Sequence, residues 1–133
     1  MAWWRRAWPR GDEGQAAVEL ALALPIVVLL VLAVVQVVLV GRDQVAVVDA
    51  AREGARAASR ASGTGADPVA AGSQAARAAA GGLEAPRLSV AVALGPVNVT
   101  VTVSYRSPTD VPFAGRLLPD IDLHATVVMR REP

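Results

Sequence analysis

One long apolar run constrains this chain more than any other feature. From Leu20 to Val40 there are 21 residues, and Gln36 is the one non-apolar side chain among them. At about 1.5 Å of helical rise per residue the run spans about 31 Å, close to the hydrocarbon thickness of a bilayer. The run therefore predicts a membrane-spanning helix over residues 15–40.

The alternative interpretation of this run is a cleaved secretory signal. The run is longer than the usual signal core of about 7–15 residues, and no small-x-small cleavage pattern follows it. We therefore expect the helix to be retained. Pro25 lies inside the run, where it removes a hydrogen bond to the Ala21 carbonyl. This predicts a kink, which a membrane helix tolerates.

The composition argues against several classes of function. The net charge is +1 over 133 residues, so bulk electrostatics imply no nucleic-acid partner. The chain has no Cys and a single His, so we expect neither a metal site nor another cofactor. No nucleophile elbow and no phosphate-binding glycine loop occurs in the sequence. We expect a protein without enzymatic activity.

A helical pattern continues beyond the apolar run, to about Arg60. Small and apolar residues recur there at spacings of three and four, a pattern typical of one buried helix face; they are Val45, Val48, Ala51, Ala55 and Ala58. A second helix is predicted to start at Pro68, with Asp67 as its N-cap, and to end at Gly81 and Gly82.

The last third of the chain changes from helical to alternating periodicity. Residues 88–94, 97–106 and 121–129 each alternate apolar with polar or small side chains, which predicts strands. Gly95 and Pro96 predict a hairpin between the first two, and residues 107–120 a long loop. We expect an α+β fold: a long N-terminal helix, part transmembrane and part soluble, packed on a three- or four-stranded antiparallel sheet.

A carboxylate at the start of the apolar run needs an explanation, because an ionised acid in hydrocarbon is costly. Glu19 stands five residues after Gly14, and a basic tail precedes both. This order resembles the processing signal of type IV prepilins, in which a membrane peptidase cuts after the glycine. The resemblance implies cleavage between Gly14 and Gln15. It also implies that Glu19 pairs with the new terminal amine of a neighbouring subunit during assembly.

Two motifs narrow the resemblance to the TadE-like family of the tight-adherence (Flp) pilus system. The first family motif is G-x-A-x-V-E-F-A-L-x-x-P, and the chain reads GQAAVELALALP from Gly14 to Pro25, with Leu20 in place of the usual Phe. The second is A-A-R-E-G-A-R, matched from Ala50 to Arg56 and including Arg52, Glu53 and Gly54. The V-T-V-S-Y and A-T-V-V-M-R-R-E segments fit the family's C-terminal region, so the resemblance covers most of residues 14–132.

The resemblance implies a minor pilin or pseudopilin that takes part in assembling a type IVb (Flp) pilus. Residues 1–14 would be a cytoplasmic leader, 15–40 the transmembrane helix and 41–133 an extracytoplasmic pilin-like domain of a single-pass inner-membrane protein. Implied partners are the prepilin peptidase, the major Flp pilin, related minor pilins, the inner-membrane assembly platform and membrane lipid. The rival hypothesis is an unprocessed single-span protein whose outer domain binds a ligand or another envelope protein.

Overall fold

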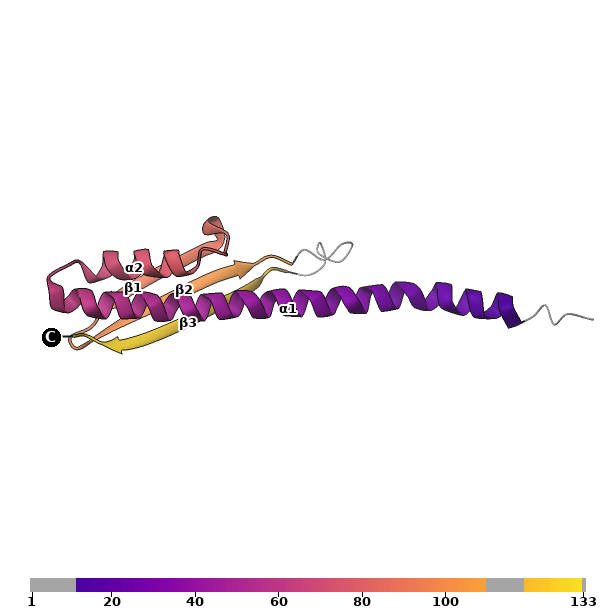
Figure 1. Ribbon diagram of the computed structural model, residues 1–133, viewed down its shortest axis with the longest axis horizontal. Helices are drawn as coiled ribbons and strands as arrows, with labels where there is room; N and C mark the ends of the chain where they lie inside the picture. The colour runs from indigo at the N-terminus through magenta and orange to yellow at the C-terminus, as the bar shows by residue number, and fades with distance from the viewer. Residues whose placement is uncertain (1–11, 110–118, 133) are drawn as a thin grey trace, which may run out of the picture. The chain divides into compact units, whose positions relative to one another are not determined.

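The computed structural model describes residues 12–109 and 119–132 (Figure 1). It separates into two compact units, residues 1–35 and 36–133. Most of the predicted 107–120 loop and of the predicted leader lies outside the described residues. The elements, in chain order, are α1 (Asp12–Thr64), α2 (Pro68–Ala79), the short 3₁₀ helix η1 (Ala85–Arg87), β1 (Leu88–Leu94), β2 (Asn98–Ser107) and β3 (Ile121–Arg130).

Helix α1 confirms the predicted long helix and extends past Arg60 to Thr64. It ends where Gly65 adopts a φ of 75°, the left-handed conformation that glycine adopts at helix C-termini without steric cost. Helix α2 then begins as predicted. The Asp67 carboxylate accepts a hydrogen bond from the Val69 amide at 2.9 Å, and Pro68 occupies the first turn.

The three strands form one antiparallel sheet in the order β1-β2-β3. The register aligns Val92 with Val101, and Val101 with Val127. The predicted α+β class, a long helix with a small three-stranded antiparallel sheet, is therefore confirmed. Central strand β2 is the most deeply buried, since Val99, Val101 and Val103 are fully excluded from solvent.

Two helices, not one, cover the inner face of the sheet (Figure 1). A Cβ atom built on Gly54 of α1 would lie 3.1 Å from the Val101 side chain, and one built on Gly72 of α2 would lie 3.3 Å from the Val92 side chain. The sequence analysis predicted α2 but did not predict that it packs on the sheet. The small residues of α2 let it lie beside α1, over strand β1.

The buried face of α1 also differs from the predicted stripe. Ala51, Ala55 and Ala58 are buried as expected, but Val45 is 61% exposed and Val48 is only half-buried. Val47 and Ala50 are fully buried in their place. The helix turns its smallest residues to the sheet and to α2, because closely packed elements leave room only for small side chains.

Polar side chains form hydrogen bonds between α1 and the sheet region inside the second unit. Ser59 Oγ donates to the Arg130 carbonyl at 2.6 Å, and Ser107 Oγ donates to the Asp43 carboxylate at 2.7 Å. Gln36, the polar residue of the apolar run, donates to the Pro108 carbonyl at 3.1 Å. These bonds satisfy polar groups close to the core, which would otherwise carry a desolvation cost.

Candidate functional site

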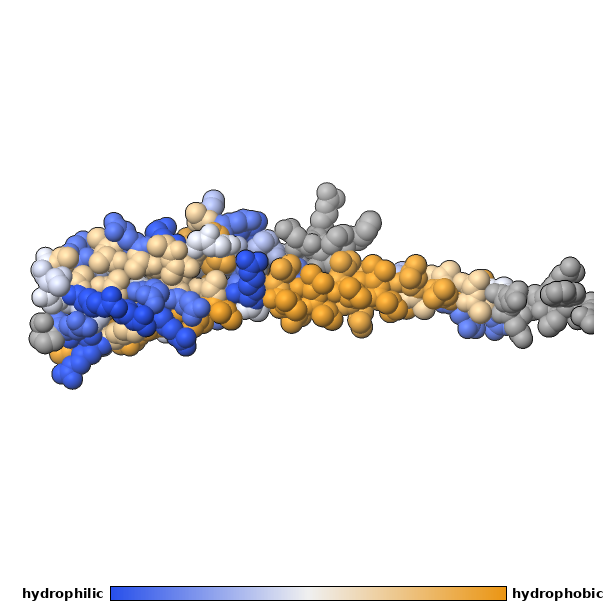
Figure 2. Space-filling model, in the orientation of Figure 1, coloured by the Kyte–Doolittle hydropathy of each residue, from blue (hydrophilic) through white to orange (hydrophobic). Residues whose placement is uncertain are grey.

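The N-terminal part of α1 is an apolar helix without a protein cover. Apart from half-buried Leu32, every side chain from residue 14 to residue 35 is exposed, and Figure 2 shows the run of large aliphatic residues as a largely orange surface. The helix is long and apolar enough to cross a membrane by length and composition. A helix that is apolar on all sides requires a non-aqueous surrounding.

Glu19 lies near the start of this exposed helix, one turn after Gln15. The Gln15 side-chain amide donates to the Glu19 carboxylate at 3.3 Å, and Gly14 precedes them in the same helix. The carboxylate thus lies within one helical turn of the predicted cleavage position. Pro25 lies inside α1 as predicted, while the kink assigned to it stays a prediction.

The A-A-R-E-G-A-R motif, residues 50–56, contains both buried small residues and exposed charged residues. Gly54, with its neighbours Ala51 and Ala55, faces the core. A Cβ atom on Gly54 would lie 2.9 Å from both the Ala76 Cβ atom and the Gly72 carbonyl oxygen of α2. Only glycine fits this contact without a shift of one of the two helices. Gly54 therefore sets the closest approach of α1 to α2.

The charged residues of the same motif point to solvent. Arg56 forms an ion pair with Glu53 at 2.8 Å, and Arg52 approaches Asp49 at 3.7 Å. Each pair spans three residues of the helix, and about half or more of each side chain is exposed. Such exposed pairs contribute little to stability, about 0.2–1 kcal/mol. The exposed half of the motif is therefore available for contacts outside this chain.

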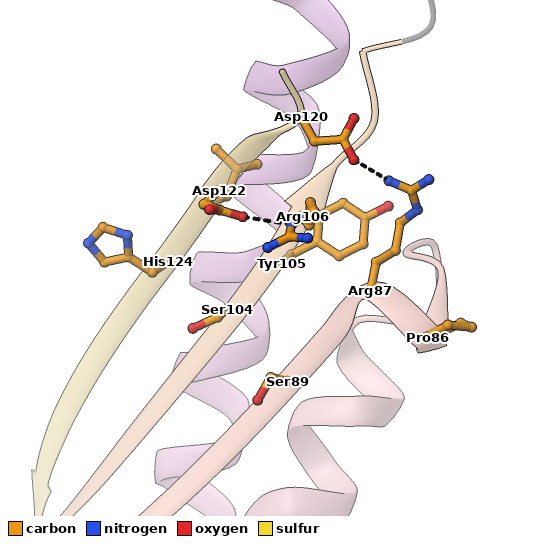
Figure 3. Close-up of a pocket in the computed structure, with 10 residues that line it drawn as sticks. Pro86, Arg87, Ser89, Ser104, Tyr105, Arg106, Asp120, Asp122 and His124 are labelled. Atoms are coloured by element: carbon orange, nitrogen blue, oxygen red, sulfur yellow. Dashed lines mark hydrogen bonds and ion pairs between the residues drawn. The ribbon is translucent and has the colours of Figure 1, made fainter.

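A shallow depression of about 650 Å³ lies on the open face of the sheet (Figure 3). Arg87 bonds Asp120 at 3.0 Å and Glu84 at 2.9 Å there, and Arg106 bonds Asp122 at 3.1 Å. Partial burial lowers the pKa of Arg87, but the hydrogen bond and charge of Asp120, together with the charges of Glu84 and Tyr105, outweigh it, so the pKa is raised above its ordinary value. The arginines and carboxylates neutralise one another in this depression.

His124, in strand β3, lies on this open face and is exposed. It stands opposite Ser104 in the strand register, but among the described residues no hydrogen bond joins the two side chains. No cluster of three or more metal-ligating side chains occurs in the described part of the chain.

Some residues that shape this structure were not identified from the sequence. Gly72 faces Gly54 across the two helices, and Asp43 and Gln44 hydrogen-bond strands β2 and β3. A signal existed for Gly72, because a glycine in a helix interior costs about 1 kcal/mol relative to alanine and usually has a packing reason. No comparable signal distinguishes Asp43 or Gln44 from ordinary solvated side chains.

The fold defines the class: a long N-terminal helix, apolar in its first part and packed on a small antiparallel sheet in its second, is a pilin-like α+β architecture. Residues 14–56 match the family model described as TadE-like protein. This confirms the TadE-like resemblance over a segment that holds both motifs. Proteins of this family are typically structural. Neither the curated proteins nor the solved structures compared gave a match.

Proposed function

We propose that this chain is a minor pilin or pseudopilin that takes part in assembling the Flp pilus, after a prepilin peptidase has removed residues 1–14. The observation that carries the proposal is the coincidence of the TadE-like match over residues 14–56 with an exposed apolar helix that carries Glu19 near its start. An anchor alone gains nothing from that carboxylate. An assembling subunit gains a charge that a partner can recognise.

The proposed role of Glu19 follows from the cost of an unpaired charge in a low-dielectric medium. Cleavage after Gly14 would create an ammonium group on Gln15, four residues before Glu19. An ammonium group of a neighbouring subunit would neutralise the carboxylate, whereas a buried charge without a partner is strongly unfavourable. Glu19 would therefore hold adjacent subunits in a fixed register.

The proposal includes an orientation and a set of partners. Three arginines precede the apolar helix and three follow it, so the positive-inside rule is nearly balanced; they are Arg5, Arg6 and Arg10 before it and Arg42, Arg52 and Arg56 after it. We assign a cytoplasmic N-terminus and an extracytoplasmic C-terminal unit by analogy with prepilins. The partners would be the prepilin peptidase, the major Flp pilin, related minor pilins and the assembly platform of the inner membrane.

Mass spectrometry of the protein isolated from host membranes tests the processing step. We expect the mature chain to begin at Gln15, because Gly14 provides the small residue before the cut. A matched Gly14→Leu variant should retain its leader. An intact leader in the parent protein would favour the rival proposal, an unprocessed single-span envelope protein.

Glu19→Gln tests the assembly step. The substitution removes a charge from the apolar helix, so we expect insertion at normal levels, while pilus number and crosslinks to other pilins fall strongly because the amine loses its counter-charge. Asp67→Asn is the matched control, since it makes the same carboxylate-to-amide change at a helix N-cap where asparagine is equally suitable. Normal piliation by the Glu19→Gln chain would refute the assembly role.

A further inference from the structure

The apolar run of α1 is too short to cross a bilayer if it ends where the second unit begins. Residues 20–35 are 16 residues without a polar side chain. At about 1.5 Å of helical rise per residue they span about 24 Å, whereas the hydrocarbon core is about 30 Å thick. Residues 36–40 supply about 7.5 Å more, and they include Val37, Val38 and Leu39, which are 72%, 65% and 45% exposed. A full span therefore needs residues of the second unit.

The alternative is a span displaced towards the N-terminus. A span that ends at Val35 would have to begin at about Ala16, which would move Glu19 deeper into the hydrocarbon. The same displacement would leave the exposed aliphatic side chains of residues 37–39 in water. Both changes are unfavourable, the first because a charge is costly in hydrocarbon and the second because apolar surface is costly in water. The span that includes residues 36–40 is therefore preferred.

The second unit is already folded around this part of α1. Gln36 Nε2 donates to the Pro108 carbonyl at 3.1 Å, and Val40 packs against the hydrophobic core. Thr109 Oγ1 donates to the Pro119 carbonyl at 3.1 Å, which joins the residues after β2 to those before β3. The end of β2 and the start of β3 therefore lie beside a stretch of α1 that the bilayer is needed to surround.

The side chains at this end of the second unit suit the boundary between lipid and water. Arg42 is exposed two residues beyond Val40, and among the described residues it takes part in no ion pair. Ile121, the first residue of β3, is 41% exposed and stands opposite Ser107 in the register. Ser107 is bonded to Asp43 of α1 at 2.7 Å, so Ile121 lies close to the turn that carries Arg42. A guanidinium group matches lipid phosphate, and an aliphatic side chain matches the upper acyl region.

We propose that this end of the second unit, the basal surface formed by Gln36, Arg42, Pro108 and Ile121, lies in the phospholipid headgroup layer of the membrane that α1 spans. Arg42 binds lipid phosphate there, and the hydrocarbon boundary falls near Val40. The second unit is thus held on the bilayer surface and is not raised above it on a free length of helix. The inference rests on the proposed membrane-anchored role, because that role supplies the bilayer.

Fluorescence quenching at single cysteines measures the depth of this surface, since the chain contains no Cys of its own. The full-length protein carries an environment-sensitive fluorophore and is reconstituted into vesicles of phosphatidylcholine and phosphatidylglycerol, with or without nitroxide on the headgroups. We expect strong quenching at Ile121→Cys. Val97→Cys is the control, 62% exposed in the hairpin beyond the far end of β2. It should be quenched roughly threefold less, because the strand places it about 30 Å further away. Equal quenching at the two sites would overturn the proposal.

Charge reversal at Arg42 tests the phosphate contact. On the Ile121→Cys background, Arg42→Glu should lower headgroup quenching about twofold or more, because a cation attracted to an anionic surface becomes a repelled anion. Arg60→Glu is the matched control, since Arg60 is also exposed on α1 but lies 18 residues later. Protease resistance equal to that of the parent excludes unfolding as the cause. An equal response to the two reversals, or none to Arg42→Glu, would refute the contact.

Two further cysteine sites separate this inference from the proposed anchor. Val28→Cys reports on the span itself and Leu39→Cys on its boundary, each in vesicles with nitroxide on the acyl chains. We expect quenching at both sites. If Val28→Cys is quenched but Leu39→Cys and Ile121→Cys are not, the anchored role stands and the basal surface fails. If Val28→Cys is not quenched either, the anchored role fails and the basal surface fails with it.

Discussion

The two stretches of helix α1, residues 14–35 and residues 36–64, are both rich in apolar residues but differ in how far those side chains are exposed. In the first, large aliphatic side chains such as Val28 and Leu30 are 48% and 63% exposed. In the second, Val47 is fully buried, together with a row of small residues; they are Ala50, Ala51, Ala55 and Ala58. One helix thus passes from an all-round apolar surface to a narrow buried face.

This difference shows what each environment demands of a helix. In lipid every side of the helix meets hydrocarbon, so bulky aliphatic residues suit all positions. Against a sheet in water only one face is covered, and its close approach to β2 and α2 requires alanine and glycine. Beyond Val45 the exposed side chains of the second stretch are polar or charged, and Figure 2 shows blue patches over the folded unit.

The largest expected effect comes from charging the covered face. Val101→Asp would bury a carboxylate without a partner among fully excluded valines, and we expect a loss of stability of about 4 kcal/mol. Limited proteolysis of the full-length protein in detergent would detect the opening of the second unit. Ser104→Asp, on the exposed face of the same strand, should lose less than about 1 kcal/mol. Equal protease resistance of the Val101→Asp chain and the parent would contradict the core assignment.

Substitutions at two glycines of α1, Gly54 and Gly41, are expected to change stability by an intermediate amount. Gly54→Ala places a Cβ atom 2.9 Å from Ala76 Cβ and from the Gly72 carbonyl oxygen, so we expect a loss of about 2–3 kcal/mol. At Gly41 no atom lies within 4 Å of an added Cβ, so Gly41→Ala should stabilise the helix by about 0.5–1 kcal/mol. Denaturant unfolding followed by hydrogen exchange of β2 amides measures both. Changes of the same sign would disprove the close contact.

The smallest expected effect compares the same truncation in both stretches. Val47→Ala removes two buried methyl groups and should cost about 1–2 kcal/mol. Val28→Ala should change the stability of the second unit by less than about 0.5 kcal/mol, because Val28 lies outside that unit and is 48% exposed. The same exchange measurement on β2 applies. A comparable loss in both variants would show that the first stretch contributes to the core.

Most of the fold could be predicted from the sequence because its periodicities are strong. The alternation through Val99, Val101 and Val103 placed β2 correctly, and Asp67 with Pro68 marked the start of α2. The buried face of α1 differs from the predicted one, since Val45 is exposed while Val47 is buried. An alanine-rich helix has a weak periodic signal, so the position of its buried face depends on the neighbouring elements.

The candidate site was predictable only through its motifs. Gly14, Gln15 and Glu19 were recognised by spacing, and their roles in cleavage and assembly stay proposals. Gly54 belongs to a recognised motif, but its contact with Gly72 required the three-dimensional structure, because the two residues lie on different helices.

The hydrogen bonds between α1 and the end of β3 have a consequence for the timing of biosynthesis. Ser59 of α1 binds the Arg130 carbonyl, 71 positions later, and Arg131 reaches Ser62. Central strand β2 also needs β3 as its second neighbour. Contacts between such distant positions form late, since the intervening chain must first be synthesised and closed into a loop. The second unit can therefore complete its core only after nearly the whole chain has been translated, so a nascent chain without β3 would expose the apolar face of β2 to chaperones and proteases.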